Sequence, residues 1–163
     1  MSSRKKHGTG TPATLVLETA GVPFMLHGYD HNPRHPSFGQ EAAESLGFAP
    51  ERIFKTLMIQ LADGMAVGIV PVTGTLDLKA LATALGQKKA AMADPAAAQR
   101  RTGYVLGGIS PLGQRTPSPT VLDSSATEHG TILVSGGRRG LDVELSPADL
   151  IRLTGAITAS IRA

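Results

Sequence analysis

The chain has 163 residues, of which 41% are hydrophobic and 18% charged, and its formal net charge is +3. This composition predicts a globular protein with one sizeable core, and the mildly basic charge permits a phosphate-bearing partner without requiring one. Cysteine is absent, which excludes disulfides, thiolate metal sites and a cysteine nucleophile, and the aromatic content of 4% argues against stacking of many bases. Neither a signal peptide nor an apolar run of the roughly 20 residues that cross a bilayer is visible. We therefore expect a cytoplasmic protein with no membrane partner.

We expect residues 1–10 to form a disordered basic tail, because Arg4, Lys5 and Lys6 lie in a polar N-terminal segment. No linker or internal repeat divides residues 11–163, which we expect to form a single domain.

Five helices are predicted from start and stop signals, chiefly Ser, Thr or Asp caps, Pro in the first turn and Gly after the last. They are expected over residues 11–21, 37–47, 77–86, 94–103 and 146–155. In the second helix Ser37 and Gln40 form a capping-box pattern. Its expected inward-facing residues are Phe38, Ala42, Ala43 and Leu46.

Strands are predicted between these helices, over residues 24–29, 53–61, 65–72, 89–92, 120–123, 131–135, 141–145 and 156–161. Asp63-Gly64 is a strong hairpin signal, and residues 136–140, with three glycines, indicate a second turn. Helices and hairpins are mixed without strict β-α-β alternation, which favours an α+β fold over a doubly wound sheet.

Two charged side chains stand out in otherwise apolar strands. Lys55 would share a strand face with Ile53, Leu57 and Ile59, so its ammonium either lines a pocket or extends along that face to water. Asp142 would lie with Glu144 opposite Leu141, Val143 and Leu145, which is typical of a solvated strand face unless a partner such as a substrate amine is found.

The segment from Gly107 to Gly113 holds three glycines and a proline within seven residues. Its backbone N–H groups could hold an anion or a carbonyl oxygen, although a lone glycine-rich loop is more often a structural turn. Ser110 within it is a candidate hydroxyl, as are Thr56 and Ser135, but none is next to a histidine in the sequence.

Histidines recur every fourth residue at His27, His31 and His35, a spacing that could chelate a metal on a helix. Pro33 and Pro36 break any helix there, so we expect no metal site. Basic residues also recur and could together meet a phosphate backbone; they are Lys88-Lys89, Arg100-Arg101, Arg115 and Arg138-Arg139.

Several of these motifs, in this order, resemble the YbaK/EbsC family within the superfamily of prolyl-tRNA synthetase editing domains, over nearly the whole chain. They are Phe54-Lys55-Thr56-Leu57, Ala93-Asp94-Pro95, Thr102-Gly103-Tyr104, Gly107 to Gly113 with Gln114, and Ser135-Gly136-Gly137 with Gly140-Leu141-Asp142. The resemblance implies a mixed, barrel-like sheet with flanking helices. It also implies hydrolysis of Cys-tRNA(Pro), and in addition Cys-tRNA(Cys), in association with prolyl-tRNA synthetase and without cofactor or metal.

The resemblance further implies roles for single residues. Lys55, Gly107 and Asp142 would be catalytic: Lys55 would neutralise an oxyanion or the terminal phosphate, and Asp142 would hold the α-amino group. The substrate-binding residues would be Tyr29, Phe38, Thr56, Gly108, Ile109 and Ser135. The substrate's own thiol would attack its ester carbonyl. Two alternatives stay open: a deacylase for alanine or another small residue that uses activated water, and a non-catalytic module that binds tRNA or the synthetase.

Overall fold

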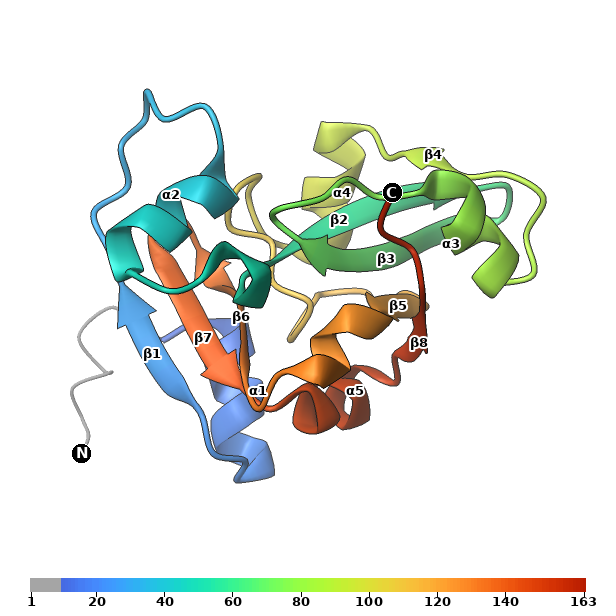
Figure 1. Ribbon diagram of the computed structural model, residues 1–163. Helices are drawn as coiled ribbons and strands as arrows, with labels where there is room; N and C mark the ends of the chain where they lie inside the picture. Colours follow the sequence, from blue (N-terminus) through green and yellow to red (C-terminus); the bar gives the residue numbers. More distant parts are fainter. Residues whose placement is uncertain (1–9) are drawn as a thin grey trace.

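The computed structural model describes residues 10–163, so the predicted tail of residues 1–10 lies, apart from Gly10, outside the described residues. Helices and two β-sheets make up this part of the chain (Figure 1). None of its helices is long and apolar enough to cross a membrane.

All five predicted α-helices are present. They are α1 (Pro12–Ala20), α2 (Phe38–Leu46), α3 (Leu78–Ala84), α4 (Pro95–Thr102) and α5 (Pro147–Thr154). Each begins after a side-chain cap as predicted, and α1, α2, α4 and α5 end at a glycine in the left-handed conformation. Two short 3₁₀ helices, Pro50–Arg52 and Ser124–Glu128, were not predicted.

Helix α2 departs from the prediction in two ways. The Ser37 side chain accepts a hydrogen bond from the Gln40 N–H, but the Gln40 amide donates to the carbonyl of Val72 instead of returning to Ser37. The predicted capping box is therefore only half formed. Phe38 does not enter the core; it is 40% exposed, because the first turn of α2 lies at the edge of a cavity instead of over a sheet.

The strands form two sheets, which confirms the α+β class. In chain order they are β1 (Met25–Gly28), β2 (Phe54–Leu61), β3 (Gly64–Pro71), β4 (Ala91–Met92), β5 (Thr120–Asp123), β6 (Ile132–Arg138), β7 (Leu141–Leu145) and β8 (Ile157–Ala159). One sheet is antiparallel with the order β1-β7-β6, and the other is mixed with the order β4-β2-β3-β5-β8. The single barrel-like sheet implied by the resemblance is thus two sheets, joined by a lone bridge between Ile53 and Leu133.

The predicted turn at residues 136–140 is wrong in extent. Strand β6 continues to Arg138, which pairs with Leu141, while Ser135 pairs with Asp142. The two glycines between Ser135 and Arg138 are extra residues that bulge out of the ladder, and the turn itself shrinks to Arg139-Gly140.

The main core lies between the two sheets and includes Phe54 and Met58 of β2 and Val134 and Val143 of β6 and β7. The predicted alternation in β7 is confirmed, since Leu141, Val143 and Leu145 are each at most 2% exposed. The opposite face of β7 is not solvated at Asp142, which is 6% exposed. Asp142 instead faces a cavity.

Candidate active site

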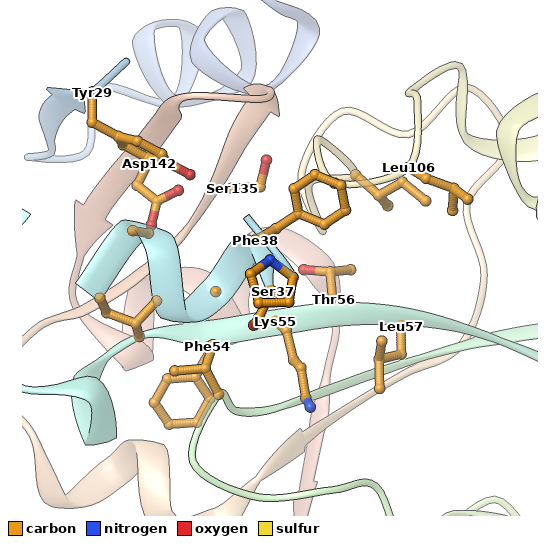
Figure 2. A pocket seen from close by; sticks show the side chains of 17 residues that line it. Tyr29, Ser37, Phe38, Phe54, Lys55, Thr56, Leu57, Leu106, Ser135 and Asp142 are labelled. Carbon is orange, nitrogen blue, oxygen red and sulfur yellow. The ribbon is translucent and has the colours of Figure 1, made fainter. Parts of the chain in front are cut away.

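A cavity of about 370 Å³ opens between helix α2, strand β2, the loop after α4 and the β6–β7 pair (Figure 2). Of the nine site residues predicted from the sequence, all but Gly108 line it. They come from segments as far apart in the chain as Tyr29 and Asp142. Lining residues that the sequence reasoning missed are Pro36, Ser37, Gly39, Ala42, Ile53, Phe54, Leu57, Val72 and Leu106.

Asp142 forms the acidic end of the cavity. Its carboxyl has no hydrogen-bond or ion-pair partner among residues 10–163, and burial raises its pKa to about 7. Figure 2 shows the Tyr29 side chain on the same side as this carboxyl. Burial, followed by the charge of Asp142, raises the pKa of Tyr29 to about 12, so its phenol stays protonated. A buried acid with no partner is suited to receive a cation from a ligand.

Strand β2 supplies Lys55 and Thr56. On the side of β2 that faces β4, the pairing with β4 covers Ile59 and Gln60, so Lys55 and Thr56 lie in the part of the strand edge that β4 does not pair. Successive side chains of a strand point to opposite faces, and both can line the cavity because it lies over this edge. Figure 2 shows the Lys55 side chain running away from Tyr29, Ser135 and Asp142. Lys55 and Asp142 therefore do not form an ion pair, and they lie in different parts of the cavity.

The two β2 side chains are both incompletely satisfied within the described residues. Lys55 is half-buried with no carboxylate partner in that part of the chain, and burial lowers its pKa. The Thr56 hydroxyl is buried and has no hydrogen-bond partner there. Unpaired buried polar groups are costly, so a ligand that completes them would bind favourably here.

The loop after α4 forms the third wall, with Leu106, Gly107 and Ile109 lining the cavity. Gly107 has a φ of 82°, and a Cβ added to it would lie 2.7 Å from the Phe38 ring. The backbone conformation therefore favours glycine, and any side chain here would push the Phe38 ring away from its position at the cavity.

Some backbone N–H groups of this loop already donate hydrogen bonds within the protein. Fewer of them are therefore available to hold a substrate oxygen than the sequence predicted. The Gly108 N–H donates to the carbonyl of Val105, and the Leu106 N–H donates to the Gln99 side chain. Gly108 is buried against the backbone of Arg138, away from the cavity lining. Ser110 is fully buried and its hydroxyl accepts from the Leu112 N–H, so it belongs to the turn.

The segment between β1 and α2 borders the cavity beside Tyr29, and two of the three regularly spaced histidines, His31 and His35, hold it to α2. Nδ1 of His31 lies 2.8 Å from Oε1 of Glu41. Burial acts to raise the pKa of Glu41, but hydrogen bonds from the Asn32 N–H and His31 lower it overall.

The other two histidines also have glutamate partners: His35 pairs with Glu44 at 3.0 Å, and His27 pairs with Glu144 at 2.8 Å. Each histidine thus contacts its own carboxylate, and residues 10–163 hold no group of three acid, His or Cys side chains that could hold a metal. His31 and His35 therefore join the segment to α2, whereas His27 joins β1 to β7.

None of the recurring basic residues that the sequence suggested for a phosphate backbone lines the cavity; they are Lys88-Lys89, Arg100-Arg101, Arg115 and Arg138-Arg139. Arg101 donates to Ser118 and Pro117, and Arg115 donates to the carbonyl of Arg100, so these two hold the loop that follows α4. Arg139 differs, because it contacts two residues at the cavity mouth, Leu106 and Phe38.

The family model for the aminoacyl-tRNA editing domain matches residues 34–153, which include every predicted site residue except Tyr29. The chain belongs to this family. A protein of Enterococcus faecalis that carries the name Cys-tRNA(Pro)/Cys-tRNA(Cys) deacylase EbsC is 37% identical over 160 residues, or 98% of this chain and 97% of that protein. The expected YbaK/EbsC type is thereby confirmed.

Solved structures agree with the fold. One described as a trans-editing enzyme for prolyl-tRNA synthetase matches with a TM-score of 0.83 and 25% identity, covering 100% of this chain and 99% of that one. Another, a scaffold protein for computationally designed presentation of linear epitopes, matches with a TM-score of 0.81 and 26% identity, over 94% of this chain and 98% of that one.

Proposed function

We propose that this protein is a trans-editing deacylase that removes cysteine from mischarged Cys-tRNA(Pro), and from Cys-tRNA(Cys) as a second substrate. Membership of the aminoacyl-tRNA editing family supports the deacylase chemistry, and the name carried by its 37% identical relative supports cysteine as the amino acid. The observation that carries the proposal is the buried, unpartnered carboxyl of Asp142 inside the cavity. It receives the α-ammonium group that every aminoacyl ester presents.

The substrate binds with its ester directed from Asp142 towards β2. Tyr29 and Phe38 lie beside the aminoacyl group and limit the size of side chain that fits. The Thr56 hydroxyl gains the hydrogen-bond partner that it lacks within residues 10–163. Lys55 stabilises negative charge that develops on the ester oxygen or is carried by the terminal phosphate.

In the proposed reaction the substrate supplies its own nucleophile. The cysteine sulfur bonds to the ester carbonyl carbon, the bond from that carbon to the ribose oxygen breaks, and the thiol proton ends on the ribose oxygen. Water then opens the resulting thiolactone to free cysteine. The protein contributes by holding the thiol and the carbonyl close together, because an oriented intramolecular attack avoids most of the entropy cost of bringing reactants together.

Such editing has a physical reason. Proline and cysteine are close in volume, and a small difference in apolar contact gives a synthetase limited discrimination. A second site that responds to the thiol distinguishes the two. We propose that the protein does this beside prolyl-tRNA synthetase, in line with the description of the neighbour at 25% identity. Co-sedimentation of the two proteins with and without tRNA(Pro) tests the association.

A deacylation panel with Cys-, Ser-, Ala- and Pro-tRNA(Pro) tests the reaction. We expect hydrolysis of the cysteine ester well above that of the serine ester, because a hydroxyl is the poorer nucleophile. Equal rates for these two esters would exclude attack by the substrate thiol. Faster release of alanine than of cysteine would select the alternative that uses activated water, and binding without any cleavage would select a non-catalytic module.

A further inference from the structure

Arg139 connects two walls of the cavity at its mouth. Its Nε donates a hydrogen bond to the carbonyl of Leu106 at 2.7 Å. Its guanidinium carbon lies 5.3 Å from the centroid of the Phe38 ring. Leu106 and Phe38 both line the cavity, whereas the Arg139 side chain is exposed. The guanidinium therefore lies at the rim, where a group entering the cavity must pass.

The backbone that carries Arg139 is held tightly on both sides. A Cβ on Gly108 would lie 2.8 Å from the Cα of Arg138, and a Cβ on Gly140 would lie 2.6 Å from the carbonyl oxygen of Tyr29. The turn thus packs directly against the glycine loop and the end of β1. The backbone of Arg139 is therefore already ordered, so binding a ligand costs the freedom of its side chain and adds little backbone entropy.

Most of the guanidinium remains free to bind. An arginine has five N–H donors, and of these only the Nε donor of Arg139 has a partner among residues 10–163. No carboxylate in that part of the chain forms an ion pair with it. Beside it lie exposed apolar surfaces, since Phe38 is 40%, Leu106 39% and Val105 52% exposed.

A cation without an acidic partner next to exposed apolar and aromatic surface is suited to one kind of ligand, a nucleotide. The fork of N–H donors matches the oxygens of a phosphate, and a flat base gains from stacking on an aromatic or apolar surface. In an aminoacyl-tRNA the ester is itself attached to a nucleotide, so such a group would lie at the cavity mouth.

We propose that Phe38, Leu106 and Arg139 form a binding site for the terminal nucleotide of the RNA. Arg139 binds the 5′-phosphate of that nucleotide, and the base lies against Phe38 and Leu106. Of its two proposed roles, Lys55 then keeps the one on the ester oxygen. This inference rests on the proposed function, because it takes the aminoacyl group in the cavity as the point from which the RNA extends. Arg139 here is a substrate-binding residue outside the reacting centre.

Binding of a tRNA(Pro) acceptor-stem microhelix tests the inference without requiring any reaction. The RNA is prepared with its full CCA end and with the terminal adenosine nucleotide removed, and each form is titrated against wild type and Arg139→Ala. The phosphate contact with Arg139 should contribute about tenfold in affinity, the size of one good charge-assisted contact, so wild type should lose more than this on truncation because the base contact is lost as well. The Arg139→Ala variant should lose less affinity on truncation than wild type does, because only the contact of the base with Phe38 and Leu106 remains to be lost.

Two further variants sharpen the comparison. Arg152→Ala removes an exposed arginine that pairs with Asp149 on α5, and it should respond to truncation as wild type does. Arg139→Lys keeps the charge but loses the planar fork, so it should recover only part of the tenfold effect. The slope of log Kd against log salt should fall by about 0.7 in Arg139→Ala, as expected for one lost phosphate contact on a single strand.

Three results would overturn the inference. The first is no measurable binding of the full microhelix by wild type, and the second is the same loss of affinity on truncation in Arg139→Ala and in wild type. The third is an equal fall in the rate of hydrolysis of cysteine methyl ester and of Cys-tRNA(Pro) in Arg139→Ala. The last would mean that Arg139 holds the cavity wall. If the proposed function is wrong, wild type will not cleave Cys-tRNA(Pro). The affinities of the two microhelices can still be compared in that case, so the two failures are distinguishable.

Discussion

Ser135 on β6 pairs directly with Asp142 on β7, immediately before the bulge that lets β6 continue to Arg138. Directly opposed residues of an antiparallel pair project from the same face of the sheet, and here that face forms part of the cavity. The pairing places a hydroxyl and a buried acid side by side. Because this acid is buried in the cavity, its titration is the most useful one to measure at the site.

We predict that Asp142 titrates near neutral pH. Burial raises its pKa to about 7, so the carboxyl is only partly ionised at neutrality, and binding of a substrate ammonium should strengthen as pH rises through that value. A ¹³C-NMR titration of the side-chain carboxyl, assigned by its disappearance in Asp142→Asn, measures this pKa. A midpoint near the ordinary 3.8 would contradict the prediction.

The same shift predicts how stability depends on pH. The folded protein keeps the Asp142 proton up to about pH 7, whereas the unfolded chain releases it near 3.8, so the folded state binds more protons between these values. Stability from this group is therefore present at low pH and is lost as pH rises from about 4 to 7. In urea titrations the free energy of unfolding of Asp142→Asn, relative to that of wild type, should rise by roughly 4 kcal/mol as the pH is raised from about 4 to about 8. A constant difference between the two proteins across that range would show that burial does not disfavour the charge.

Lys55→Ala should reduce deacylation strongly while it leaves the melting temperature close to that of wild type. The ammonium is half-buried without a carboxylate partner in the described residues, so its removal breaks no ion pair there. We expect a fall in kcat of about a hundredfold, the size seen when one group that stabilises developing charge is lost. A large fall in stability with normal residual specific activity would mean that Lys55 only extends along an apolar face to water.

Thr56→Val separates binding from stability. The hydroxyl is buried and unpartnered within residues 10–163, so its replacement by a methyl group of similar shape should leave the free energy of unfolding unchanged or slightly raised. If the substrate completes this group, kcat/KM should fall by about tenfold, and Thr56→Ser should retain most of the activity. Loss of activity in both variants, or in neither, would contradict a hydrogen bond from this hydroxyl to the substrate.

Gly107→Ala should both destabilise the fold and impair the cavity. The backbone φ of 82° disfavours any side chain, and the new Cβ would lie 2.7 Å from the Phe38 ring. Gly47→Ala is the matched control, because Gly47 has a similar φ of 74° but open space around it. We expect a cost of about 1 kcal/mol for Gly47→Ala without loss of activity. Gly107→Ala should cost about 2 kcal/mol more and lower kcat/KM, as overpacking does. If Gly107→Ala and Gly47→Ala changed stability by the same amount and activity by the same amount, only the backbone conformation would matter at Gly107.

The elements of this protein could be predicted well from local signals. Caps such as Asp94-Pro95 and stops such as Gly103 act within a few residues, so the helix limits depend little on the rest of the fold. The β2–β3 hairpin, whose turn is Ala62-Asp63 and so lies one residue before the predicted Asp63-Gly64, and the apolar alternation in β7 are local for the same reason. The order of the site motifs along the chain also identified the family.

Interactions distant in sequence decided the rest. The extension of β6 to Arg138 depends on pairing with Leu141, the exposure of Phe38 depends on where α2 lies, and the histidines turned out to hold glutamates of α2 and β7. The sequence by itself determined which residues are candidates for the chemistry and on which local elements they lie. Only the tertiary structure decided that Asp142 is buried with no partner in the described residues while Lys55 points elsewhere from a free strand edge. Burial and desolvation are properties of packed neighbours far apart in the chain, and no local pattern encodes them.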